Sequence, residues 1–199
     1  IALDRHRAWQ HDIRRREPRA CFGEMLYVDG SPHAWLALQP GERQTVIAVI
    51  DDATSRMLYG KLVDNEDTHS VMEAMRAVMS KYGIPAAFYT DRASWAFVTP
   101  KAGGEVDPKA MTQVGRALKR LGVEHIPAYT PQARGRSERL NSTLQDRLVN
   151  ELKAAGIQTI EEANGFIEQV YIPRHNELFA RSARDPADVF ISVPASVDL

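Results

Sequence analysis

The sequence has one cysteine, no long apolar run and almost no net charge, and each scarcity excludes a class of protein. Cys21 has no partner for an internal disulfide, so nothing in the chain requires an oxidising compartment. No stretch approaches the roughly 20 apolar residues of a membrane-spanning helix, and the start of the chain has no signal-peptide core. We therefore expect a cytoplasmic protein without a membrane partner. No GxGxxG or Walker sequence follows an expected strand, which removes the main support for a nucleotide cofactor.

The chain has 199 residues, of which 44% are hydrophobic and 26% are charged, as in a soluble globular domain. Its net charge of −1 conceals two basic tracts. Residues 1–20 hold six arginines against three acids, and residues 112–153 hold eight lysines and arginines against four acids, giving +3 and +4. Such tracts suit a polyanion such as DNA, although charge alone slightly favours ordinary solvated helix faces.

Hydrophobic periodicity predicts an α/β fold with five strands and four helices. The expected strands cover residues 24–29, 44–51, 56–63, 86–90 and 123–129, and the expected helices run from about 67 to 83, 109 to 121, 135 to 155 and 160 to 178. Pro173 should kink or divide the last helix. Three hairpin-linked strands followed by alternating strands and helices predict a mixed sheet with helices on its faces. This order excludes an all-parallel dinucleotide-binding fold.

Three carboxylates occupy special places in this plan. Asp29 lies at or near the end of the first expected strand, Asp91 ends the fourth, and Glu138 lies in the first turns of the long helix. Asn141 and Gln145 extend a polar face of that helix. A buried, unpaired carboxylate costs several kcal/mol, so a positive group should compensate. For a single acid an arginine is the better explanation, whereas three converging acids suit a pair of Mg²⁺ or Mn²⁺ ions.

Four segments in this order carry a family resemblance: MLYVDGS, VIAVIDDATSRMLYGKLV, FYTDR and IPAYTPQARGRSERLNSTLQDRL. Over about residues 20 to 180 they resemble successive landmarks of the DDE transposase and retroviral integrase catalytic core, which has a ribonuclease H-like fold. Within this family the sequence is most similar to bacterial insertion-sequence transposases. The most specific part runs from Pro131 and Gln132 through Gly135 to Glu138 and Asn141.

The resemblance implies that Asp29, Asp91 and Glu138 match the three metal-binding catalytic acids of the family, which hold two Mg²⁺ or Mn²⁺ ions. It further implies hydrolysis at a transposon end, then attack of the freed 3′-hydroxyl on target DNA, by a homo-oligomer. The sequence departs from many relatives at Arg92, which stands where a glycine often follows the aspartate. The loop KAGGEVDP also lengthens the interval between Asp91 and Glu138.

Further residues are expected to contact DNA or the acids. Arg134 and Arg136 precede Glu138 at the start of the long helix, where backbone donors and basic side chains favour phosphate, so we expect DNA contacts there. Asn141 and Gln145 are expected to contact the metal ligands or DNA.

Other candidates have simpler structural explanations. His33 and His125 have no histidine or cysteine at ligand spacing, so both are interpreted as structural. Core packing is the stronger explanation for Trp35 and Trp95. A turn is the simpler explanation for the adjacent pair Asp51 and Asp52.

The expected organisation is a basic N-terminal arm or linker (1–20), an integrase-like core (21–180) and a C-terminal tail (181–199). The arm fits two interpretations equally well: a linker that follows the DNA backbone, if a helix-turn-helix module precedes it in the full protein, or a solvated disordered arm. Two alternatives remain open at this point. One is a structure-specific or RNA:DNA-hybrid nuclease of the same fold without joining activity. The other is a non-catalytic DNA-binding or assembly module.

Overall fold

A computed structural model describes residues 17–39, 41–101, 104–129, 131–197 and 199, and for residues 131–138 only the backbone. The arginines expected in the N-terminal arm before Glu17 lie outside the described residues. Within the described part, no helix is both long and apolar enough to cross a bilayer.

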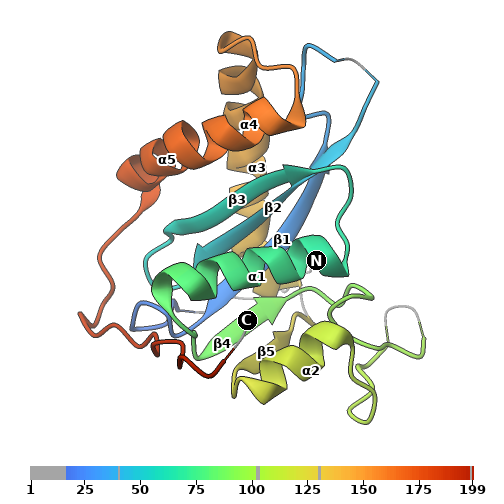
Figure 1. The fold of residues 1–199 in the computed structure, drawn as a ribbon, viewed down its shortest axis with the longest axis vertical. Coiled ribbons are helices and arrows are strands. Elements are labelled where there is room, and N and C mark those ends of the chain that lie inside the picture. The colour runs from blue at the N-terminus through green and yellow to red at the C-terminus, as the bar shows by residue number, and fades with distance from the viewer. Residues whose placement is uncertain (1–16, 40, 102–103, 130, 198) are drawn as a thin grey trace, which may run out of the picture.

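Five strands form one mixed sheet in the order β3-β2-β1-β4-β5 (Figure 1). The strands are β1 (Leu26–His33), β2 (Gln44–Asp51), β3 (Met57–Val63), β4 (Ala87–Thr90) and β5 (Glu124–Pro127). The first three form the predicted antiparallel meander, and β4 and β5 join it in parallel to β1. The predicted ribonuclease H-like sheet is therefore confirmed.

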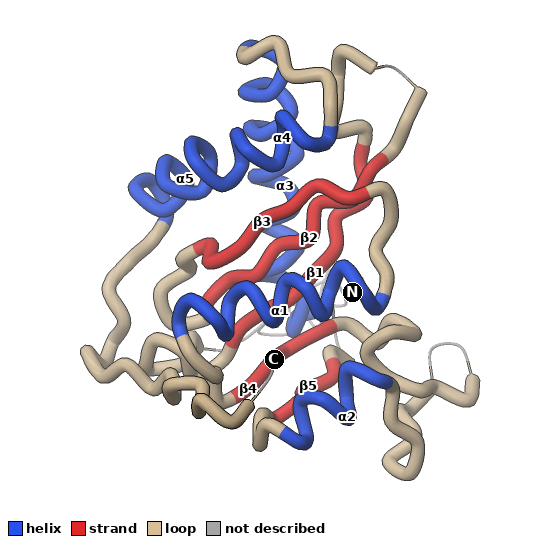
Figure 2. Tube along the Cα trace, in the orientation of Figure 1, coloured by secondary structure: helices blue, strands red, loops and turns tan. Residues whose placement is uncertain are grey.

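Helices cover both faces of the sheet, as Figure 2 shows. On one face α1 (Thr68–Tyr82) and α2 (Gln113–Arg120) enclose a core to which β1 contributes Leu26 and Val28. On the other face, α3 (Pro131–Ala154) buries four leucines, one at every fourth position from Leu140 to Leu152. They pack against β2, β3 and the helix that follows α3. Because successive strand residues point to opposite faces, Tyr27, Asp29 and Ser31 of β1 belong to the α3 side.

Helix α1 begins and ends at the predicted residues. The Asp67 side chain accepts a hydrogen bond from the Ser70 backbone N–H at 2.7 Å, and the Ser70 hydroxyl accepts one from the Asp67 N–H at 3.0 Å. The helix ends at Gly83, whose φ of 109° favours glycine. A Cβ there would also lie 2.7 Å from the Ile191 carbonyl oxygen, so glycine lets the C-terminal tail approach.

The last helix is divided, as the sequence predicts from Pro173. It consists of α4 (Ile160–Phe166), a π-helical turn (Ile167–Tyr171) and α5 (Ile172–Phe179). Proline cannot donate a helical hydrogen bond, and the wider π turn just before it accommodates that loss.

Two asparagines attach this divided helix to the edge strand β3. Asn164 exchanges two hydrogen bonds with the Leu62 backbone, at 2.6 and 2.9 Å, and Asn176 does the same with Met57, at 2.7 and 2.9 Å. These side chains occupy backbone groups that would otherwise leave the edge of the sheet open to pairing.

Three predicted boundaries differ from the observed ones by four residues. Helix α2 begins at Gln113 and not near Lys109, because the Thr112 hydroxyl caps it by accepting from the Gly115 N–H at 3.1 Å. Helix α3 begins at Pro131, four residues before the prediction, since proline suits a first helical turn. Strand β1 continues to His33, so Asp29 lies in its middle: beyond Val28 the strand loses β4 but keeps β2 as its partner.

The C-terminal tail packs against the start of the described chain. Residues Phe22 and Asp188 form a parallel bridge, and Ile84 and Ile191 form an antiparallel one. The Phe190 ring lies 5.0 Å from the Phe22 ring, centroid to centroid. The tail therefore contributes side chains and backbone pairing to the α1 side of the fold.

Candidate active site

Asp29 and Asp91 lie side by side at the point where β4 separates from β1. The last parallel pair joins Val28 to Thr90, so the two aspartates are the next residues along the chain, Asp29 within β1 and Asp91 one residue beyond the end of β4. Neighbouring strands lie about 4.8 Å apart, and residues in register on parallel strands point to the same face. Both carboxylates are partly exposed and belong to the face covered by α3.

Helix α3 carries two polar residues, Asn141 and Gln145, that contact this part of β1. We call them the polar stripe of α3. The Asn141 side-chain amide donates to the Asp29 carboxylate at 2.9 Å, and the Gln145 amide donates to the Ser31 hydroxyl at 3.1 Å. Glu138 is three residues before Asn141, hence on the same helix face and about one turn nearer the start of α3. Its side chain, like those of Arg134 and Arg136, lies outside the described residues.

A third described carboxylate, Glu66, adjoins this pair. The Trp95 indole N–H donates to it at 3.0 Å, and its other oxygen lies over Gly30, where a Cβ would approach it to 2.5 Å. Burial, then repulsion from Asp91 and Asp29, raises the pKa of the Glu66 carboxyl to about 7. Acidic side chains are therefore concentrated near the end of β4, where it separates from β1.

Asp91 lies at the start of a turn, and its neighbour in sequence is Arg92, whose guanidinium has defined contacts. Its carboxylate accepts a hydrogen bond from the Ala93 N–H at 2.9 Å. The neighbouring Arg92 donates to the Gly104 carbonyl and stacks over the Tyr129 ring, 5.0 Å from its centroid. Arg92 thus connects the long loop after β4 to the segment that leads into α3.

The donor set fits a divalent cation. Asp29 and Asp91 offer hard oxygen ligands in register, and the buried Asn141 side-chain oxygen has no hydrogen-bond partner in the described part of the chain. A hydrated cation beside Asp29 would supply such a partner. Among the described side chains no group of three acids, histidines or cysteines is close enough to hold a metal, and the expected third ligand, Glu138, has no described side chain.

Two cavities of about 480 and 460 Å³ occur in the described part, and neither is lined by Asp29 or Asp91. The larger lies beside Asp51, and the smaller lies between the long loop and α2.

The sequence interpretation of the remaining candidates agrees with their placement. Trp35 and Trp95 are buried in the two cores. The His125 ring stacks on Phe97 and makes a 2.9 Å hydrogen bond with the Thr90 hydroxyl; burial lowers its pKa to about 4. His33 packs edge-on against Trp35.

Asp51 and its neighbour form a hydrogen-bonded corner, as the sequence interpretation expects. Asp51 accepts from the Thr54 N–H at 2.7 Å, from the Thr54 hydroxyl at 2.6 Å and from the Gly23 N–H at 3.0 Å.

Sequence reasoning missed Glu66 and Tyr129. The segment DNEDTHS offers several acids, of which only Asp67 has a recognisable position as the helix cap. Nothing in the local pattern distinguishes Glu66 as the one that turns toward Asp29. Tyr129 ends an expected strand, so the pattern predicts packing, yet its side chain is 51% exposed.

Comparison with known proteins finds insertion-sequence transposases. The chain is 37% identical over 164 residues to the Sinorhizobium fredii protein named "Putative transposase y4bF", which covers 81% of this chain. It is 35% identical over 168 residues to the transposase for insertion sequence IS1202 of Streptococcus pneumoniae, covering 84% of this chain. In both cases the chain spans only 35% of the relative's length. No family model matches the chain.

Solved structures with the same fold are retroviral integrases. A chain of the simian T-cell lymphotropic virus intasome matches with a TM-score of 0.61 at 13% identity, covering 92% of this chain and 61% of that one. The HTLV-2 integrase catalytic core domain, solved with magnesium, matches with a TM-score of 0.53 at 13% identity, covering 75% and 88%. The chain is thus a homologue of insertion-sequence transposases with the ribonuclease H-like fold of an integrase catalytic core.

Proposed function

We propose that the chain is the catalytic domain of a DNA transposase, which cuts DNA at transposon ends and joins the freed 3′-hydroxyl to target DNA. The observation that carries this proposal is the register of Asp29 and Asp91 beneath the polar stripe of α3. Homology to insertion-sequence transposases supports the choice of DNA as the substrate. As a DNA-processing domain the chain would work in the cytoplasm, as part of a homo-oligomer.

Asp29, Asp91 and Glu138 would hold two Mg²⁺ or Mn²⁺ ions. Bound metal would stabilise negative charge on the attacked phosphate and lower the pKa of the attacking water or hydroxyl. The ions would also offset the repulsion from Asp91 and Asp29 that, after burial, raises the pKa of Glu66. The integrase core domain solved with magnesium is consistent with this use of metal.

The chain's own residues orient the reacting groups. Asn141 fixes the Asp29 carboxylate through its 2.9 Å hydrogen bond, and the Ala93 N–H fixes the Asp91 carboxylate. The ordered Arg92 presents a cation beside Asp91, where a DNA phosphate would lie. Arg134 and Arg136 would add phosphate contacts from the start of α3, where the helix dipole favours an anion.

The test is an assay that follows cutting and joining separately. Purified chain with Mg²⁺ or Mn²⁺ is incubated with labelled duplexes that carry the ends of the insertion sequence encoding it. Asp29→Asn, Asp91→Asn and Glu138→Gln should each reduce both products at least about 10³-fold, since each removes a metal ligand, and leave the melting temperature near that of the wild type.

Normal joining by any of these variants would remove that residue from the mechanism. Metal-dependent cutting without any joined product would favour a nuclease of the same fold. Binding of DNA without metal uptake, measured by calorimetry with Mn²⁺, would favour a non-catalytic module.

A further inference from the structure

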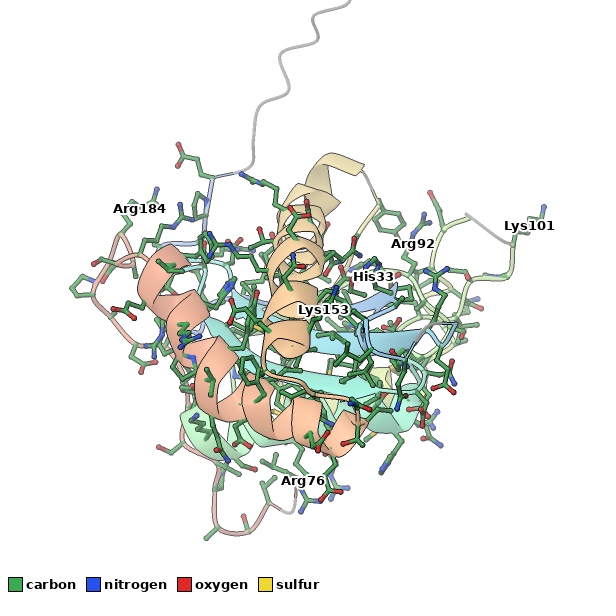
Figure 3. The ribbon with its side chains drawn as sticks, turned by 90° about the horizontal axis from the view of Figure 1, so that it is seen from above. His33, Arg76, Arg92, Lys101, Lys153 and Arg184 are labelled. Carbon is green, nitrogen blue, oxygen red and sulfur yellow. The ribbon has the colours of Figure 1, made fainter. Side chains whose placement is uncertain are left out.

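Asp91 is the first residue beyond the paired part of β4. The strand ends at Thr90, which still pairs with β1 and whose carbonyl accepts a hydrogen bond from the Ala128 N–H at 2.9 Å. In the view of Figure 3, the following residue, Arg92, lies between α3 and the loop tip that carries Lys101. A metal ligand needs partners that fix its orientation. Contacts other than strand pairing must therefore orient Asp91.

Thr90 and His125 form a hydrogen-bonded pair on the face of the sheet opposite to the Asp91 side chain. Consecutive strand residues point to opposite faces, so Thr90, which is 1% exposed, lies on the α2 side with Phe88. His125 is in register with Phe88 and shares that face. The Thr90 hydroxyl oxygen lies 2.9 Å from His125 Nε2 and 3.0 Å from the Asp91 carbonyl oxygen. The sheet therefore separates both side chains from a metal on the α3 side.

The single proton of the Thr90 hydroxyl determines how this pair is connected. When Thr90 donates to the Asp91 carbonyl, its oxygen must accept a hydrogen bond from His125. Burial lowers the pKa of His125 to about 4, so the ring is neutral near pH 7 and carries one N–H. The arrangement that makes both contacts places this N–H on Nε2. His125 then holds the Thr90 hydroxyl in the direction that binds the Asp91 backbone.

The turn that begins at Asp91 returns to the same histidine. The Asp91 carboxylate accepts from the Ala93 N–H at 2.9 Å, and the Ala93 carbonyl accepts from the Phe97 N–H at 3.0 Å. The Phe97 ring stacks on the His125 ring, with centroids 4.1 Å apart and planes inclined by 23°. The contacts thus form a closed path from Asp91 through Ala93, Phe97, His125 and Thr90 back to Asp91.

We propose that His125 is a positioning residue that orients the Asp91 carboxylate for metal binding, through the Thr90 hydroxyl and the Phe97 ring. This inference rests on the proposed function, in which Asp91 is a metal ligand. Loss of an outer partner of a metal ligand typically reduces metal affinity by about 10- to 100-fold. His125 acts through the backbone of Asp91 and not on its carboxylate, so we expect the lower end of this range.

The test measures Mn²⁺ affinity by calorimetry and the Mn²⁺ concentration that gives half-maximal cutting of labelled transposon-end duplexes, well below each variant's melting temperature. His125→Phe keeps an aromatic ring against Phe97 without the N–H, and Thr90→Val keeps the side-chain shape without the hydroxyl. Each should weaken Mn²⁺ binding about tenfold and raise the half-maximal concentration by the same factor. Cutting at saturating Mn²⁺ should stay within about threefold of the wild type, because the ligands themselves are intact.

Two further variants separate positioning from general damage to the fold. The double variant of His125→Phe and Thr90→Val should bind Mn²⁺ no more weakly than either single variant, because both changes break the same path. His125→Gln should recover most of the affinity, because its amide nitrogen donates from about the position of Nε2.

His175→Phe is the matched control. His175 is also buried, at 6% exposure, with its ring centroid 4.9 Å from that of Phe179 and its pKa lowered to about 4 by burial, but it lies on α5. Its substitution should leave the Mn²⁺ affinity unchanged.

Wild-type Mn²⁺ affinity in both His125→Phe and Thr90→Val would overturn the positioning role and leave the proposed function standing. An additive loss in the double variant, or an equal loss in His175→Phe, would do the same. Absence of Mn²⁺ binding and of cutting by the wild type would instead overturn the proposed function, and the positioning role with it.

Discussion

Two pairs of aspartates in this molecule look alike in sequence and differ completely in their surroundings. Asp29 and Asp91 follow the apolar runs MLYV and AFYT, and the pair Asp51 and Asp52 follows VIAVI. The second pair is almost fully buried, at 0% and 1% exposure, and Asp51 is saturated by three donors from Gly23 and Thr54. The first pair is partly exposed and faces another acid, Glu66.

The difference shows what separates a structural carboxylate from a reactive one. Backbone N–H groups aimed at Asp51 fix its position, and Asp52 in turn accepts from the Arg19 N–H at 2.6 Å. Such a corner joins the end of β2 to the start of the described chain. Around Asp29 and Asp91 the protein instead places a further acid, Glu66, whose pKa is raised by burial and by repulsion from Asp91 and Asp29. Groups with a perturbed pKa tend to cluster at functional sites.

The largest effect on stability is expected from Asp51→Asn. This change replaces one of the two acceptor oxygens by an NH₂ group, which faces either the two Thr54 donors or the Gly23 N–H, and the groups left without a partner in this buried corner cost about 3 kcal/mol together. The melting temperature should fall by roughly 6–12 °C for a chain of this size. Asp91→Asn, measured in the same thermal scan without metal, should be as stable as the wild type or slightly more so. The comparison fails if the two substitutions destabilise equally.

Asn141→Leu comes next, because it removes the donor that orients Asp29 and preserves side-chain volume. Loss of an outer partner of a metal ligand typically reduces metal affinity or activity by about 10- to 100-fold. Mn²⁺ affinity measured by calorimetry should fall within this range, with little change in the melting temperature. Asn141→Gln, a longer amide, should recover part of the affinity if the hydrogen bond is what matters. Full affinity in Asn141→Leu would show that Asp29 is oriented by other contacts.

Much of this fold can be predicted from the sequence, because helix starts, ends and breaks depend on local residue preferences. The cap at Asp67, the stop at Gly83 and the division at Pro173 follow from single residues, and all three are observed. The positions of Glu66 and Tyr129 do not follow from local rules. Glu66 lies over Gly30, which has no Cβ to exclude it, and accepts a hydrogen bond from Trp95, and both contacts join segments far apart in the chain. The aspartate pairs are distinguished in the same way, by donors such as Gly23 that sequence proximity does not reveal.

Glu66→Gln tests the concentration of charge through pH. The raised pKa of Glu66 means that folding favours its protonated form. Its contribution to stability is full below the ordinary carboxyl pKa of 4.5 and is lost as the pH rises toward about 7. The variant should therefore match the wild type at low pH and exceed its unfolding free energy by on the order of 1 kcal/mol above neutrality, after allowance for solvent screening.

Chemical denaturation across this pH range measures the difference. Glu124→Gln, at an exposed position on β5, controls for the general loss of one negative charge. A variant less stable than the wild type above neutrality would mean that Glu66 is held by favourable contacts and that the acids do not repel one another.

Gln145→Ala should have the smallest effect on melting temperature and on Mn²⁺ affinity. It therefore tests whether Asn141 acts on Asp29 by itself. Gln145 donates to Ser31, two residues beyond Asp29 on the same strand face, through a neutral hydrogen bond of 3.1 Å. Such a bond contributes about 1 kcal/mol or less, so the melting temperature should fall by only a few degrees. Mn²⁺ affinity should stay within about twofold of the wild type, because this bond does not reach a metal ligand. If Gln145→Ala weakened Mn²⁺ binding as much as Asn141→Leu, the polar stripe would act as one unit. A graded response would instead locate the functional contact at Asn141, where α3 meets Asp29.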